Sequence, residues 1–238
     1  MRILITGSSG KLGSALRKIY PDALAPTHAD LDVTDKEKVK AYITEERPDV
    51  IIHTAAFTSV ARAETEHETC WKLNVGGTEN LVDALRAVNP SAFFVYIGTA
   101  CVFYGDKGMY TEDDIPRPKN FYSLTKLIGE YVVRLVPKHL IVRTNFVAKE
   151  KWPYPKAFTD RFGTYLFADD VARGIREVIE KDMRGVVHVA GDTKMSMYEL
   201  AKLTTPDVGE TTMKETNLPL TVDMTLASVK IKPFKISA

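Results

Sequence analysis

Short hydrophobic runs alternate with amphipathic segments along most of this chain. Runs rich in β-branched side chains predict parallel strands that are buried on both faces, and apolar residues that recur every three or four positions predict helices. We expect strands at residues 2–6, 23–27, 48–53, 93–97, 140–142 and 186–189. We expect helices at residues 11–20, 36–46, 68–88, 121–135 and 168–179.

This alternation predicts an α/β fold with a doubly wound, mainly parallel Rossmann sheet. Residues 1–145 would carry most of the sheet as a dinucleotide-binding domain, and residues 168–191 would return to it. Residues 146–167 are aromatic and rich in proline, and residues 192–238 end without clear periodicity. We expect these two tracts to form a small C-terminal substrate-binding subdomain, although a plain hydrophobic lid fits them equally well.

The first predicted strand ends in a glycine turn with the spacing Gly-x-x-Gly-x-x-Gly. Glycines at a strand-to-helix turn let the backbone approach a pyrophosphate, and the amides of the helix N-terminus stabilise its charge. Elsewhere the same spacing would indicate an ordinary loop. Here it predicts cofactor contacts from Gly7, Ser9, Gly10, Lys11, Leu12 and Gly13.

The strand expected at residues 23–27 is followed by Thr27 and His28 instead of an Asp or Glu. An NAD-preferring site places a carboxylate there, against the ribose 2′-hydroxyl. Together with Lys11, neutral or basic surroundings accept a 2′-phosphate, so NADP(H) is favoured over NAD(H). An exposed lysine in a first helical turn is an equally good interpretation of Lys11.

Small and polar residues follow the next elements toward the same edge of the sheet. Asp32 could accept a hydrogen bond from an adenine amino group, and small residues after the strand at 48–53 would leave room for a cofactor. Asn74 either supports these strands or is an exposed helix residue, and the alanines could simply be core. We expect cofactor contacts from Asp32, Val33, Ala55, Ala56, Phe57 and Asn74.

Two adjacent glycines, Gly76 and Gly77, interrupt the helix expected at residues 68–88. Two glycines inside a helix cost roughly 1 to 2 kcal/mol relative to alanine. We therefore expect close packing against another helix or the sheet at this point.

Tyr122 and Lys126 stand four residues apart on the helix expected at 121–135, and so share one of its faces. A nearby ammonium stabilises a phenolate and lowers the tyrosine pKa, which would make the pair a proton donor. Such pairs also occur by chance on many solvated helices. Thr99 follows the strand at 93–97, at the edge where α/β sheets bind ligands. We take Thr99, Tyr122 and Lys126 as candidate catalytic residues.

Composition narrows the class of protein. With 238 residues, 45% hydrophobic and 26% charged, the chain is ordinary for one folded domain, and its formal charge of +1 argues against a broad nucleic-acid surface. The chain has no close histidine pair of the kind that binds zinc in metallohydrolases, and it has no Gly-x-Ser-x-Gly motif of a serine hydrolase. Cys70 and Cys101 lack metal-ligand spacing, and no apolar run approaches a membrane span. We expect a soluble cytoplasmic protein without a metal, and a homodimer is compatible with it.

In this order, the glycine turn, Thr99 and the Tyr-x-x-x-Lys pair resemble the extended branch of the short-chain dehydrogenase/reductase superfamily. The chain more closely resembles the dTDP-4-dehydrorhamnose reductase family. The blocks that carry the resemblance are Leu31-Asp-Val-Thr-Asp35, Pro48-Asp-Val-Ile-Ile52, Ala55-Ala-Phe-Thr58, Asn74-Val-x-Gly-Thr78 and Asn120-x-Tyr122-x-x-Thr-Lys126-x-x-Gly-Glu130. The match covers about residues 1–145 and continues more loosely through Asp169-Asp-Val-Ala172 and Val187-His-Val-Ala-Gly191.

The resemblance implies an oxidoreductase of dTDP-rhamnose biosynthesis that transfers a hydride from NADPH to a 4-keto nucleotide sugar. Tyr122 would protonate the nascent alkoxide, and Lys126 would lower the tyrosine pKa and hold the nicotinamide ribose. Thr99 would hydrogen-bond the carbonyl oxygen. These roles are physically sensible because donors must face the oxygen on which negative charge develops.

The chain departs from the family near the expected sugar. Where the family reads Ser-Thr-Asp-Tyr-Val-Phe, this chain reads Gly98-Thr-Ala-Cys-Val-Phe103, so a carboxylate and a phenol are missing. Phe146 stands where the family places a tryptophan. We expect substrate contacts from Thr99, Ala100 and Phe146 in a pocket that differs from the family's usual one.

Two other functions remain open. The altered pocket favours a cofactor-binding regulatory subunit that resembles the β-subunit of methionine adenosyltransferase, whereas the intact Tyr122 and Lys126 argue against it. A sugar-nucleotide epimerase or dehydratase shares the fold and the pair. Such an enzyme would retain NAD, so the nucleotide that co-purifies with the protein distinguishes it from a reductase.

Overall fold

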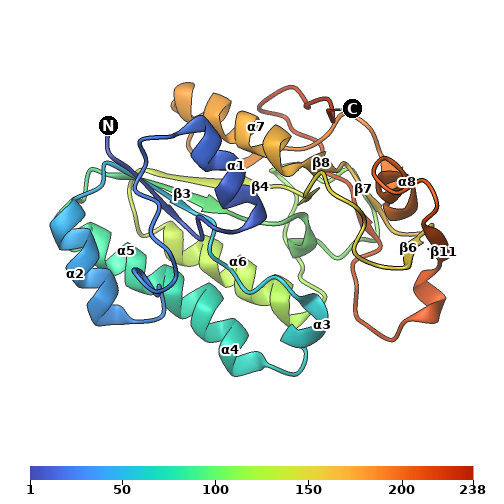
Figure 1. Ribbon diagram of the computed structural model, residues 1–238, viewed down its shortest axis with the longest axis horizontal. Coiled ribbons are helices and arrows are strands. Elements are labelled where there is room, and N and C mark those ends of the chain that lie inside the picture. Colours follow the sequence, from blue (N-terminus) through green and yellow to red (C-terminus); the bar gives the residue numbers. More distant parts are fainter. Residues whose placement is uncertain (238) are drawn as a thin grey trace.

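A computed structural model describes residues 1–237 as three layers, with a parallel sheet between two layers of helices (Figure 1). The sheet has the strand order β1-β2-β3-β4-β9. Its strands are β1 (Ile3–Thr6), β2 (Val50–His53), β3 (Phe93–Ile97), β4 (His139–Arg143) and β9 (Gly185–His188). The helices are α1 (Lys11–Ile19), α2 (Lys36–Glu46), α3 (Val60–Ala63), α4 (His67–Trp71), α5 (Gly77–Val88), α6 (Phe121–Val133), α7 (Ala168–Glu180) and α8 (Met197–Lys202). The predicted doubly wound α/β class is confirmed.

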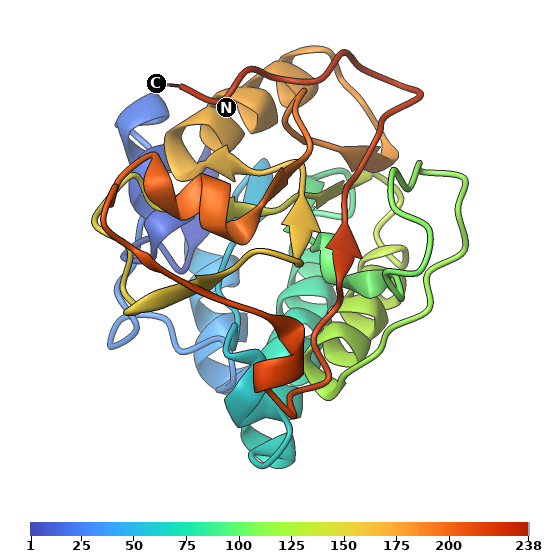
Figure 2. The same ribbon diagram turned by 90° about the vertical axis from the view of Figure 1, so that its right-hand side faces the viewer.

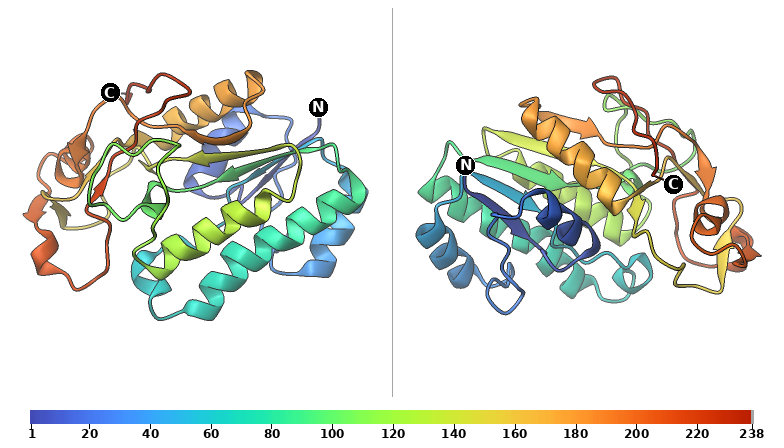
Figure 3. Two further views of the ribbon diagram at one scale, coloured as in Figure 1. Left: turned by 180° about the vertical axis from the view of Figure 1, so that it is seen from behind. Right: turned by 45° about the horizontal axis from the view of Figure 1, so that its top comes forward.

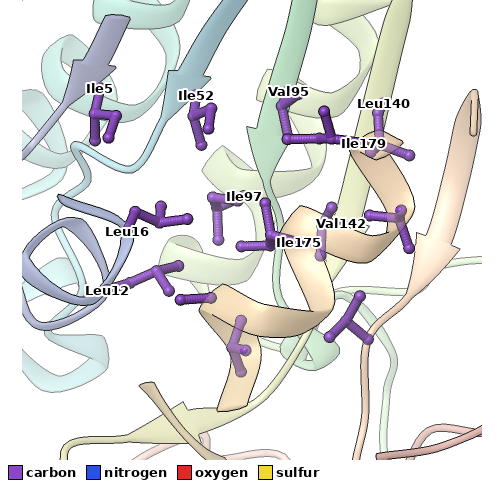
Figure 4. Close-up of a cluster of buried hydrophobic side chains, with 14 of the residues drawn as sticks. Ile5, Leu12, Leu16, Ile52, Val95, Ile97, Leu140, Val142, Ile175 and Ile179 are labelled. Atoms are coloured by element: carbon purple, nitrogen blue, oxygen red, sulfur yellow. The ribbon is translucent and has the colours of Figure 1, made fainter. Parts of the chain in front are cut away.

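Helices α1 and α7 cover one face of the sheet, and α2, α5 and α6 cover the other (Figures 1 and 3). Successive strand residues therefore face different helices. Ile5 lies in the cluster under α1 and α7, and Leu4 lies in the cluster of the opposite face. Figure 4 shows the first cluster, in which Leu16 of α1 and Ile175 of α7 lie over the strands. Burial on both faces explains why the strands are continuous apolar runs.

The strand expected at residues 23–27 is reduced to a single bridge, so this prediction is wrong in extent. Leu24 pairs with Leu4 beside β1: its amide donates to the Ile3 carbonyl and its carbonyl accepts from the Ile5 amide, both at 2.8 Å. Pro26 then follows, and proline has no amide hydrogen with which to continue a ladder. The remaining sheet strands lie within two residues of their predicted positions.

The helix expected at residues 68–88 forms as three joined segments: α4, a π-helical turn at Lys72–Gly76, and α5. A Cβ atom on Gly77 would lie 2.8 Å from Cγ2 of Val33, which confirms close packing at this glycine. A Cβ atom on Gly76 would have no neighbour within 4 Å, so the same expectation is wrong for Gly76.

The tracts that break the helix and strand alternation lie beyond the carboxyl ends of the central strands, at the right of Figure 1 and toward the viewer in Figure 2. They contain α8 and three small sheets, in which β5 pairs with β8, β6 with β11, and β7 with both β10 and β12. Their strands are β5 (Phe146–Val147), β6 (Lys156–Phe158), β7 (Phe162–Gly163), β8 (Leu166–Phe167), β10 (Met195–Ser196), β11 (Gly209–Thr211) and β12 (Asp223–Met224). Short 3-10 helices cover Ala100–Val102 and Met213–Glu215. The last residue assigned to the subdomain, Ala238, lies outside the described residues.

Within residues 1–237, no helix is both long enough and apolar enough to cross a membrane.

Candidate active site

The sheet reverses its order of growth at β1. The chain leaves β1 for Leu24 on one side and later returns to β2 on the other side. Ligands of open α/β sheets bind outside the carboxyl ends of the strands at such a switch point. A cavity of about 960 Å³ lies at this edge, and its walls include Gly10, Thr54, Thr99 and Thr144, which follow β1, β2, β3 and β4.

The glycine turn between β1 and α1 leaves no room for a side chain at Gly7 or Gly13. Gly7 has a φ of +65°, and a Cβ atom on it would lie 2.6 Å from the backbone nitrogen of Ala55. A Cβ atom on Gly13 would lie 2.2 Å from the Gly7 carbonyl oxygen. No side chain caps the N-terminus of α1, whose N-cap is Gly10. Such a turn fits a dinucleotide phosphate, because its backbone can approach closely and the helix amides favour an anion.

The predicted residues of this turn divide between the cavity and the core. The cavity is lined by Gly10, Lys11, Leu12 and Gly13, whereas Gly7 lies behind it against the backbone of Ala55, and Ser9 is exposed outside its lining. Lys11 forms an exposed ion pair of 2.7 Å with Glu150 across the cavity mouth. The ammonium has three donors and uses one of them on Glu150, so the others could meet a cofactor phosphate.

Asp32 and Val33 were predicted to contact the cofactor, and neither lines the cavity. The Asp32 carboxylate accepts hydrogen bonds from the Thr34 amide and hydroxyl, both at 2.9 Å. Val33 packs against Gly77, and its carbonyl accepts a bond of 3.0 Å from the Asn80 amide. Both residues make local contacts in this structure, and their contact with a cofactor stays a prediction.

Asn74 holds the segment that follows β2. Its amide oxygen accepts from the Phe57 backbone nitrogen at 2.7 Å, and its amide nitrogen donates to the Phe57 carbonyl at 3.1 Å and to the Thr125 hydroxyl at 2.9 Å. Asn74 thereby ties residues 55–57 to α6, from a buried position outside the cavity lining. Ala56 lines the cavity, whereas Ala55 and Phe57 do not.

The three candidate catalytic residues all line the cavity and are all buried. Thr99 follows β3, and Tyr122 and Lys126 lie in the first turns of α6. Asn120 caps this helix through a 2.9 Å bond from the Ser123 amide to its side chain. The spacing of the helix and the end of one strand thus bring two hydroxyls and an amine to one wall.

Burial dominates the acid–base properties of this wall. Burial raises the pKa of Tyr122 well above its usual value, and a hydrogen bond with Thr99 partly opposes that rise. Burial lowers the pKa of Lys126 to about 7, and the negative charge of Glu130 partly opposes that change. The Lys126 ammonium lies 4.1 Å from the centre of the Tyr96 ring. The net shift of the Tyr122 pKa is upward because desolvation of the phenolate outweighs the hydrogen bond from Thr99, and the lowering expected from Lys126 stays a prediction.

The substrate side of the cavity combines predicted and unpredicted residues. Phe146 lines it as expected, but Ala100 is fully buried in an apolar cluster outside its lining. Lining residues that the sequence did not predict include Thr58, Trp152, Arg161, Met197 and Leu220. Aromatic and proline content marked the tract that holds Trp152, whereas nothing local distinguished Leu220. Among residues 1–237, no group of three or more His, Cys, Asp or Glu side chains is placed to hold a metal ion.

Comparison with known proteins identifies the family. Residues 1–158 match the family model described as RmlD substrate binding domain. A dTDP-4-dehydrorhamnose reductase of Aggregatibacter actinomycetemcomitans is 32% identical over 230 residues, which cover 84% of this chain and 76% of the relative. Methionine adenosyltransferase 2 subunit beta of Rattus norvegicus is 31% identical over 236 residues, covering 84% of this chain and 70% of the relative.

A solved structure of dTDP-4-dehydrorhamnose reductase from Bacillus anthracis str. Ames in complex with NADP superimposes with a TM-score of 0.85. It is 28% identical, and the match covers 95% of this chain and 90% of that one. The resemblance drawn from the motifs is thereby confirmed, as is the expected class of NAD(P)-dependent oxidoreductases at the level of the family. The chain belongs to the RmlD substrate binding domain family, together with the dTDP-4-dehydrorhamnose reductases.

Proposed function

We propose that this protein is an NADPH-dependent reductase of a 4-keto nucleotide sugar, most like dTDP-4-dehydrorhamnose. One observation carries the proposal: Thr99, Tyr122 and Lys126 line the same cavity as residues 10–13 of the glycine turn. A cofactor on the turn would lie against the wall that holds the acid. The relatives named as reductases support the substrate class.

Each residue has a role that its surroundings support. NADPH, when bound, supplies a hydride to the carbonyl carbon. Tyr122 is protonated at neutral pH, as a phenol of ordinary pKa already is, and burial raises its pKa further, so it holds the proton that the carbonyl oxygen must receive. The Thr99 hydroxyl hydrogen-bonds the same oxygen and stabilises its developing charge. Lys126 donates to the ribose hydroxyls and so orients the nicotinamide.

The preference for NADP(H) over NAD(H) rests on Thr27 and His28, which stand where an NAD-preferring site has a carboxylate, and on Lys11 in the cavity lining. The B. anthracis relative, which contains NADP, supports it. Both cysteines are free and buried, which supports a reducing cytoplasm as the location.

The test measures NADPH oxidation by the purified protein with dTDP-4-dehydrorhamnose as the substrate. One NADPH should be consumed for each molecule of sugar that is reduced. A Tyr122→Phe variant should lose at least roughly a hundredfold in turnover, since general acid catalysis contributes about that much or more. NADPH binding, measured by fluorescence, should stay unchanged. Absence of turnover with a panel of keto-sugar nucleotides would exclude this substrate class, and full activity of the variant would exclude Tyr122 as the acid.

A second candidate is a regulatory subunit, which the altered pocket around Cys101 and the similarity to a methionine adenosyltransferase subunit favour. A pull-down with a methionine adenosyltransferase catalytic subunit tests it. Stoichiometric capture, together with absence of turnover, would replace the reductase proposal. Tightly bound NAD in the purified protein would instead indicate an epimerase or dehydratase.

A further inference from the structure

A buried arginine lines the substrate side of the cavity. Arg161 lies between β6 and β7 and is only 9% exposed. Three lysines of the same lining, Lys11, Lys151 and Lys156, are exposed to water. Arg161 is thus a cation that the fold has withdrawn from solvent at the cavity wall.

The guanidinium makes weak contacts for a buried charge. Its Nε donates to the Thr221 carbonyl at 2.9 Å. Its two terminal nitrogens reach only thioethers, with Nη1 3.8 Å from Sδ of Met197 and Nη2 3.3 Å from Sδ of Met224. A thioether is a weak acceptor, whereas a guanidinium has five strong donors. Most of its hydrogen-bonding capacity is therefore left for another group.

The nearby carboxylates are used elsewhere. Asp160 accepts a bond of 2.9 Å from the Met213 amide, and Asp223 is paired with Lys194. Within residues 1–237, no carboxylate oxygen lies within 4.0 Å of an Arg161 nitrogen as an ion pair. The contrast is with Arg143, which is also buried but holds the Glu130 carboxylate through two bonds. A buried charge without a counter-ion is costly, so a ligand that brings one would be held strongly.

Arg161 also lies near Cys101, another residue of the cavity lining. The Cys101 thiol is 3.3 Å from the same Met224 sulfur that contacts Arg161, so the guanidinium is at most twice that distance from the thiol. Cys101 is two residues from Thr99, and both residues line the cavity. Arg161 therefore makes this side of the cavity suitable for an anion.

We propose that Arg161 binds an oxyanion of the substrate, either the diphosphate of a nucleotide sugar or a carboxylate near the reacting carbonyl. The planar guanidinium would hold two oxygens of either group at once. This inference rests on the proposed function for the identity of the substrate as a carbonyl compound, but binding of the anion does not require turnover.

The experiment measures binding by calorimetry in the presence of NADP, with dTDP as the diphosphate probe and oxamate as the carboxylate probe. At least one probe should bind the wild-type protein. Arg161→Gln should weaken that probe roughly ten- to a hundredfold, because a charge-assisted hydrogen bond is lost, and Arg161→Lys should give an intermediate affinity. Arg86→Gln removes an exposed cation from α5 and serves as the matched control, with unchanged affinity.

The stronger probe identifies the source of the anion. Unchanged NADP affinity and thermal melting would show that Arg161→Gln is folded, and Arg161→Met offers an apolar side chain of similar length if it is not. Equal affinity of wild type and the neutral variants for both probes would overturn the proposal, as would a wild-type protein that binds neither probe. A protein that binds dTDP through Arg161 but reduces no keto sugar would retain this inference and refute the proposed function.

Discussion

Loss of the buried ion pair behind the active site should destabilise the protein strongly. Glu130 of α6 accepts two hydrogen bonds from Arg143 at the end of β4, one of 2.9 Å from Nε and one of 2.7 Å from Nη2. The two side chains are 1% and 2% exposed. A Glu130→Gln variant keeps the shape of the side chain but leaves the arginine charge buried without a counter-ion.

The magnitude follows from this burial. Removal of one partner from a buried pair costs about 3–5 kcal/mol, because the remaining charge is uncompensated. In this structure Nη1 of Arg143 already has no hydrogen-bond partner among the described residues. Few other groups could therefore compensate the arginine charge once the Glu130 carboxylate is removed. A domain of this size loses roughly 2–4 °C of melting temperature per kcal/mol, which corresponds to a fall of roughly 6–20 °C.

Urea unfolding followed by circular dichroism, together with thermal melting, measures the change. The matched control is Glu180→Gln in α7, which breaks a pair with Arg176 that has the same 2.7 Å separation but is 55% and 59% exposed. Exposed ion pairs contribute little to the free energy of unfolding, so this variant should have the melting temperature of the wild type. A double variant, Glu130→Leu with Arg143→Met, should recover most of the loss, since it leaves no buried charge.

Equal stability of Glu130→Gln and Glu180→Gln would refute the reasoning, because burial would then not determine the effect. A double variant less stable than Glu130→Gln would show that the pair's geometry, and not its charge, holds α6 against β4.

Two further predictions concern the turn and the lysine. Gly7→Ala should lower the free energy of unfolding by more than about 1 kcal/mol, because φ is +65° and the new Cβ would lie 2.6 Å from the backbone of Ala55, whereas Gly76→Ala should raise it by up to about 1 kcal/mol in urea titrations. Equal effects of the two would contradict the close approach at the turn. The pKa of Lys126 is about 7 in the folded protein, below its value in the unfolded chain. At pH values between the two, the unfolded chain binds more protons than the folded protein, so wild-type stability should rise with pH above 7. Relative to Lys126→Met, that rise should reach up to about 1.4 kcal/mol per pH unit, and a pH-independent difference would contradict the shift.

The sequence alone determined the elements whose signals are local. The helix at residues 36–46 forms over its predicted range, and the central strands lie close to theirs, because apolar period and capping residues act over a few positions. Tyr122 and Lys126 share a face for the same reason, since four residues span about one helical turn. The glycine turn could also be predicted from the sequence, because the Gly-x-x-Gly-x-x-Gly spacing falls between a predicted strand and a predicted helix.

Tertiary structure decided what depends on neighbours distant in the chain. The strand expected at residues 23–27 is a single bridge at Leu24. The Asp32 carboxylate accepts a hydrogen bond from the Thr34 amide in its own turn and does not line the cavity. The direction of the Tyr122 pKa followed from burial, which no spacing reveals. Arg161 became a cavity residue only because β7 packs between β10 and β12. Local periodicity fixes which residues form an element, whereas desolvation and long-range contacts fix what a side chain can do.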